Sequence, residues 1–146
     1  TYDVIPETDE EKFVRLTKQL ENDPLGDSDK SIRAWLLRWA EKSKNVTVTI
    51  CDILGPIPNQ DVPYGPELLA QSLFGNAAFQ ISHIDRKGDM VATQLAGIRS
   101  SLRAYSSIVA QHSEARTPYF DELLGKESDG SLEAFIAPKI ANECKQ

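Results

Sequence analysis

The chain has 146 residues, with 16 lysines and arginines against 22 aspartates and glutamates, so its formal net charge is −6. Apolar residues make up 40% and charged residues 26%, an ordinary mixture for a globular protein. This length favours one domain with a sizeable core. The sequence contains no run of ~18 apolar residues, which is the length that would predict a membrane span. An acidic chain without a basic block is not expected to bind nucleic acid.

The N-terminal part predicts two helices separated by a polar turn, after an arm at 1–7. Thr8 and Glu11 form a capping-box pattern, and apolar residues at helical spacing follow as far as Leu20. The first helix ends at Asn22-Asp23-Pro24, because the residue before a proline avoids the helical region. The second helix has one apolar face at positions i, i+3, i+4 and i+7, formed by Ile32, Trp35, Leu36 and Trp39.

The middle of the chain predicts irregular structure. Residues 46–50 alternate valine or isoleucine with threonine, which indicates an extended segment, yet no second segment offers it a partner strand. It is either an extended connector or a short helix. Residues 55–66 contain four prolines and two glycines, which predicts a stiff loop. Tyr64 in this loop is the aromatic residue that we expect to be most exposed, and it is a candidate for ligand recognition.

Pro66 suits the first turn of a helix that is apolar on several faces and is therefore expected to be central. The strongest pattern follows this helix, in residues 89–113. In 89–113 the apolar positions are spaced alternately by four and three, which predicts a long helix in the centre of a bundle. The positions are Val91, Leu95, Ile98, Leu102, Tyr105, Val109 and His112.

Two shorter helices are expected after the long one. Thr117-Pro118 begins the first of them and Gly125 is a candidate end, whereas Ser131 begins the second, which Pro138 should kink or split. The predicted fold is all-α, a single domain over 1–146 with five or six helices. Its predicted core comprises Trp35, Trp39, Leu73, Phe74, Leu95, Ile98, Leu102, Val109, Phe120, Phe135 and Ile136.

The two cysteines bear on the cellular compartment of the protein. Cys51 and Cys144 lie 93 positions apart and form no metal-binding pattern. A disulfide between them fits an exported protein, which is the interpretation we favour, whereas two buried thiols would fit a cytoplasmic one. The chain starts at Thr1 and its only methionine is Met90, so we expect a removed leader or a cut chain. The predicted location is secreted or periplasmic, with cytoplasmic as the alternative.

Motifs for catalysis are scarce. No GxSxG, GxGxxG or GxxxxGK[ST] pattern occurs, so we expect no catalytic residue, cofactor or metal ion. His83 and Asp85 are two positions apart, a spacing that a base or ligand pair could use in a turn, although a solvated helix end is the simpler interpretation. Trp35 is expected to pack between helices, and its alternative role is to line an aromatic groove.

These observations favour a non-catalytic, exported helical domain that binds a protein or a small-molecule ligand. Its candidate ligand-binding residues are Tyr64, His83, Asp85 and Trp35. Two alternatives remain open. One is a small hydrolase-like enzyme that uses His83 and Asp85 as its base, and the other is an intracellular helical subunit that functions by forming oligomers.

Overall fold

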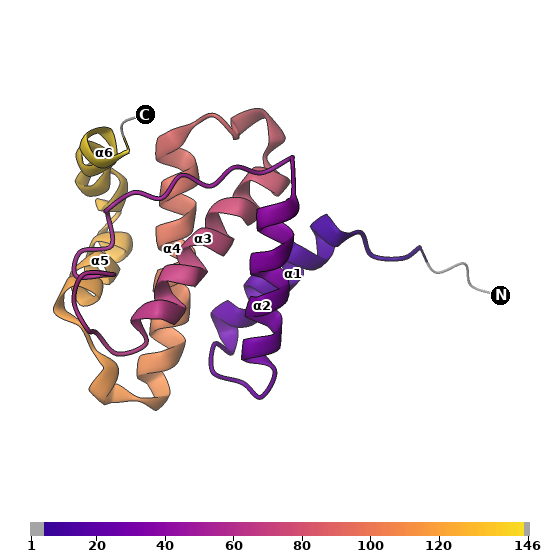
Figure 1. The fold of residues 1–146 in the computed structure, drawn as a ribbon. Coiled ribbons are helices and arrows are strands. Elements are labelled where there is room, and N and C mark those ends of the chain that lie inside the picture. The colour runs from indigo at the N-terminus through magenta and orange to yellow at the C-terminus, as the bar shows by residue number, and fades with distance from the viewer. Residues whose placement is uncertain (1–4, 145–146) are drawn as a thin grey trace.

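The computed structural model describes residues 5–144 and confirms the all-α prediction (Figure 1). No β-strand occurs between residues 5 and 144. The α-helices are α1 (Asp9–Asn22), α2 (Asp29–Lys42), α3 (Gly65–Ser82), α4 (Met90–Gln111), α5 (Pro118–Asp129) and α6 (Leu132–Glu143). Two short 3₁₀ turns, η1 (Ile84–Arg86) and η2 (Ser113–Ala115), precede and follow α4.

Helices α3 and α4 form the centre of the bundle. They make the most extensive contact in the molecule, with α1 and α2 on one side and α5 and α6 on the other (Figure 1). The two axes approach closely because Gly97 has no side chain, and a Cβ there would lie 2.4 Å from the Ser72 carbonyl oxygen. The predicted α4 stripe is buried from Leu95 to Val109, while Val91 and His112 at its ends are half-buried.

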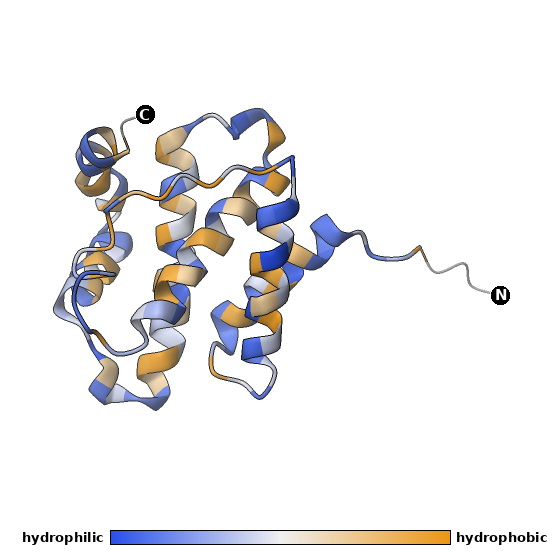
Figure 2. Ribbon diagram, viewed as in Figure 1, coloured by the Kyte–Doolittle hydropathy of each residue, from blue (hydrophilic) through white to orange (hydrophobic). Residues whose placement is uncertain are grey.

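The core consists of two clusters of buried apolar side chains. One joins α4, α5 and α6 to the segment after Cys51, and the other joins α1 and α2 to the middle of α3. Figure 2 colours the apolar residues of these elements orange along the ribbon. Seven of the eleven predicted core residues are buried. The other four, Trp35, Trp39, Leu73 and Phe135, are only half-buried. Trp35, Trp39 and Phe135 pack against the edges of the two clusters, whereas Leu73 belongs to neither cluster.

Two of the six α-helices, α1 and α4, have a side-chain hydrogen bond at the N-cap, and the other four have none. The Thr8–Glu11 capping box is confirmed, with both reciprocal hydrogen bonds at 3.1 Å. The expected end of α5 at Gly125 is wrong, since the helix continues to Gly130, whose φ of +82° suits a residue without a side chain. Pro138 does not split α6, which runs through it as one helix.

The N-terminal arm was predicted at 1–7, and its first four residues lie outside the described residues. Residues 5–7 precede α1 and are exposed. The Glu7 carboxylate pairs with the Arg15 guanidinium at 2.7 Å, which ties residue 7 to the side of α1. Arg15 lowers the pKa of Glu7 through this hydrogen bond.

Residues 43–64, called the connector below, run from α2 across the α3–α4 pair to the α5–α6 side and back to α3 (Figure 1). Residues 46–50 are extended and form neither a strand nor a helix. Two buried glutamines provide the hydrogen-bond partners that a neighbouring strand would otherwise supply to the backbone of this segment. Thr47 N–H donates to Gln80 Oε1 at 3.1 Å, Gln80 Nε2 donates back to the Thr47 carbonyl at 2.8 Å, and Gln94 Nε2 donates to the Thr49 carbonyl at 2.7 Å.

Replacing Gln80 with alanine is expected to lower the free energy of unfolding by about 1–3 kcal/mol, because it leaves backbone groups of Thr47 unpaired. Amide hydrogen exchange at Thr47 should accelerate in the same variant. Urea unfolding and exchange measured by NMR check both effects. The matched control is Gln19→Ala on the exposed side of α1, and an equal loss in both variants would contradict the pairing.

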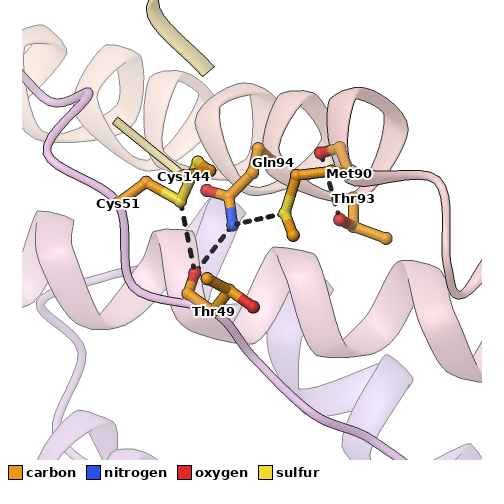
Figure 3. The surroundings of a disulfide bond; sticks show 6 residues. All are labelled: Thr49, Cys51, Met90, Thr93, Gln94 and Cys144. Carbon is orange, nitrogen blue, oxygen red and sulfur yellow. Dashed lines mark hydrogen bonds between the residues drawn. A yellow bond between two sulfur atoms is a disulfide. The ribbon is translucent and has the colours of Figure 1, made fainter. Parts of the chain in front are cut away.

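The predicted Cys51–Cys144 disulfide is present and fastens the connector to the end of α6 (Figure 3). The two Cα atoms are 5.1 Å apart. Figure 3 shows the bridge next to Thr49, whose carbonyl oxygen lies 3.8 Å from Cys51 Sγ and also accepts from Gln94. The covalent bond and the amide contact therefore hold the same short stretch of the connector.

Two tyrosines, the buried Tyr105 and the half-buried Tyr119, join other parts of the fold. The Tyr105 hydroxyl donates to Asp121 Oδ1 at 2.8 Å and accepts from Thr117 N–H at 2.7 Å, which fixes α5 against α4. The Tyr119 hydroxyl donates to the Ile53 carbonyl at 2.9 Å, which fixes the connector against α5. Burial raises the pKa of both phenols above their ordinary value of 10.0.

These raised pKa values predict a loss of stability in alkali. Above pH ~10 the tyrosines of the unfolded chain lose their protons while Tyr105 and Tyr119 in the folded chain keep theirs. Below pH ~10 these two groups therefore contribute fully to the free energy of unfolding. Their contribution falls as the pH rises through their pKa values in the folded chain. Urea unfolding at several pH values checks this, and a Tyr105→Phe, Tyr119→Phe chain should show a shallower decline. An unchanged decline would contradict the assignment.

Candidate ligand-binding groove

A groove with a cavity volume of about 480 Å³ lies between α1, α3 and α4. Each helix contributes the residues of one face to the groove. On α1 and α3 the successive lining residues are three, one and three positions apart. The volume falls within the range of ~300–1,000 Å³ typical of small-molecule sites. The lining residues from these helices are Val14, Thr17, Lys18 and Glu21 of α1, Gly75, Ala78, Phe79 and Ser82 of α3, and Ala92, Leu95, Ala96, Arg99, Ser100 and Arg103 of α4.

Small residues in the two central helices make room for the cavity. Gly75 on α3 faces Ala96 and Ser100 on α4, and a Cβ at Gly75 would lie 2.4 Å from Ser100 Cβ. Ala78 on α3 and Ala92 on α4 continue the small surface from this contact toward the η1 end of the groove. The backbones of α3 and α4 come close together at Gly75, and the short side chains around this contact leave the space that forms the groove. The groove therefore has a largely apolar floor built from the α3–α4 contact.

A chain of hydrogen bonds fixes one carboxylate at the side of the groove. Gln71 Nε2 donates to the Thr17 carbonyl at 3.1 Å and to Ser100 Oγ at 3.0 Å. The Ser100 hydroxyl donates in turn to Glu21 Oε2 at 2.6 Å. The Glu21 side chain is only 13% exposed, and Arg103 Nη1 lies 3.6 Å from the same oxygen. Glu21 thus has a defined position and holds the Arg103 guanidinium at the edge of the groove.

Four cationic side chains line the groove, although the protein as a whole is acidic. Arg86 pairs with Asp89 at 3.1 Å, and Arg99 Nε donates to both carboxylate oxygens of Glu127 at 3.1 Å. Arg103 is 60% exposed despite its contact with Glu21. The fourth cation, Lys18, makes no ion pair in the part of the chain that the structure describes.

Of the four predicted ligand-binding residues, His83 lies in this groove. Its ring stacks on Phe79 with centroids 4.3 Å apart, and Nδ1 lies 3.2 Å from the Phe79 carbonyl oxygen. Asp85 is exposed in η1 and, within residues 5–144, makes no hydrogen bond or ion pair with His83. A base needs a partner that orients it, so the geometry gives no support to the His83–Asp85 alternative.

The other two predicted residues lie elsewhere. Trp35 on α2 is half-buried, stacks on Trp39 with centroids 6.5 Å apart, and receives the Lys12 ammonium 4.3 Å from its ring centre. This is the expected packing between helices. Tyr64 precedes α3 with a φ of +57°, and its half-buried ring lies 5.9 Å from that of His112. The expectation of an exposed aromatic loop tip is therefore wrong.

Sequence reasoning missed most of the groove. Lys18, Glu21 and Arg103 look like ordinary solvated positions of amphipathic helices. One signal was available on α4, where Arg99 and Arg103 are one turn apart and continue the row that contains Ala92 and Ala96. Small residues followed by cations on one helix face indicate a surface that the neighbouring helices do not fill.

No protein-family model, curated protein or solved structure matches the chain. Between residues 5 and 144, no three histidine, cysteine, aspartate or glutamate side chains gather in a way that would hold a metal ion. None of the described helices combines the length and apolar character needed to cross a membrane.

Proposed function

We propose that the protein is a non-catalytic, exported helical domain that binds a small-molecule ligand in the groove between α1, α3 and α4. The observation that carries this proposal is the groove itself, a cavity of about 480 Å³ with an apolar floor and charged edges. Small-molecule sites typically combine a mostly apolar surface with a few placed polar groups. The Glu21–Ser100–Gln71 chain supplies such groups in fixed positions.

Two further observations support the non-catalytic and exported parts of the proposal. His83 is the only histidine that lines the groove, and its Nδ1 contact is the Phe79 carbonyl, not a carboxylate or a nucleophile. The Cys51–Cys144 bridge favours an oxidising compartment, because disulfides persist mainly in secreted and periplasmic proteins.

The test uses a neutral apolar probe, phenylnaphthylamine, whose fluorescence rises when it enters an apolar site. The wild-type chain should bind one probe per molecule. Ala96→Trp fills the groove and should abolish binding, whereas Ala110→Trp, on the exposed side of α4, should leave it unchanged. Circular dichroism establishes that both variants are folded. Equal binding by the two variants would overturn the assignment of the groove as the ligand site.

A further inference from the structure

We infer that the ligand is an organic acid with an apolar body and one anionic group, which rests on the groove being the ligand site as proposed above. The charges that line the groove carry this inference. Lys18, Arg86, Arg99 and Arg103 are opposed there by only Glu21 and Glu133, so the lining has a formal charge of +2. The whole chain has −6. The lining is therefore positive although the chain as a whole is acidic, and it surrounds a cavity of ligand size, about 480 Å³.

The individual contacts show which cations are available to a ligand. Arg99 and Arg86 already have carboxylate partners at 3.1 Å, in Glu127 and Asp89. Lys18 has none in the described part of the chain, and Arg103 has a single contact at 3.6 Å, longer than a charge-assisted hydrogen bond of ~2.7–2.9 Å. Lys18 comes from α1 and Arg103 from α4, so the available charges stand on two different walls of the groove.

The same contacts limit the ligand to one anionic group. Glu21 is held at the groove by Ser100 and would repel a second negative charge placed near it. Arg86 and Arg99 are neutralised by their own partners, so they offer little to a polyanion. The remaining surface is the apolar floor around Ala92 and Ala96, which favours an apolar body of matching size. A carboxylate or sulfonate on such a body has the required chemistry.

The experiment compares two probes that share an apolar body, anilinonaphthalene sulfonate, which is anionic, and phenylnaphthylamine, which is neutral. The sulfonate should bind more tightly to the wild-type chain, and its affinity should fall with rising salt. In Lys18→Gln, Arg103→Gln the sulfonate affinity should fall by about tenfold, since two charge-assisted contacts are lost. Affinity for the neutral probe should change by less than about twofold, since its apolar contacts remain.

The control is Arg38→Gln, Lys44→Gln, which removes the same net charge from exposed positions outside the groove and should leave both affinities unchanged. Equal loss in the two double variants would overturn the inference, because the effect would then be one of net charge. Displacement of the bound sulfonate probe by inorganic sulfate alone would also overturn it, because the site would then need no apolar body.

The failure of this inference and the failure of the proposed function give different results. If the neutral probe binds in the groove and the anionic probe binds no more tightly, only the inference about the anionic group fails. If neither probe binds, the proposed function fails with it. Binding of the anionic probe with the predicted dependence on Lys18 and Arg103 supports both.

Discussion

Replacing Cys51 and Cys144 with alanine is expected to lower the free energy of unfolding by about 2–5 kcal/mol. The bridge joins residues 93 positions apart, so it removes a large loop-closure entropy from the unfolded chain. It also anchors the connector, which otherwise depends on the amide contacts of Gln80 and Gln94 and on the Tyr119 hydroxyl. Urea unfolding of the wild-type and substituted chains measures the difference.

A reducing agent provides the matched control for this prediction. It should destabilise the wild-type chain by a similar amount and leave the doubly substituted chain unchanged. Mass measurement after alkylation verifies that two thiols are released on reduction. A wild-type unfolding midpoint that does not respond to reduction, although both thiols are released, would contradict the stabilising role of the bridge.

The second large effect is expected in the long central helix. Leu102 on α4 is 2% exposed and belongs to the cluster that joins α4 to α5 and α6. Leu102→Ala should therefore lower the free energy of unfolding by about 2–5 kcal/mol, through lost apolar burial and the cavity that remains. Leu37→Ala on α2 serves as the control, because Leu37 is 39% exposed and should cost less than about 1 kcal/mol. Similar losses in both variants would show that the α4 stripe is not the core of the bundle.

Residues that interact within one helix could be assigned from the sequence. The reciprocal bonds of Thr8 and Glu11, and the alternating spacing from Leu95 to Val109, depend on neighbours three or four positions apart. The expected helix end at Gly125 and the expected split at Pro138 were wrong, because glycine and proline limit a helix only when its surroundings agree.

Residues that interact across the fold could not be paired in this way. Gln80 meets Thr47 across 33 positions, and Ser100 meets Glu21 across 79. Nothing in the local pattern distinguishes these residues from solvated polar positions. The groove could not be predicted for the same reason, since its three walls come from separate helices and its floor depends on the close approach of α3 and α4 at Gly75 and Gly97.

The location of the bound probe tests the groove most directly. Backbone amide shifts in two-dimensional NMR can be followed while anilinonaphthalene sulfonate is added to the isotope-labelled wild-type chain. We expect the shifts to concentrate on the faces that line the groove, at Lys18, Ala78, Ala96 and Arg103. The contradicting result is a cluster of shifts at residues 57–66, where the proline-rich part of the connector and the start of α3 form a separate cleft of about 370 Å³.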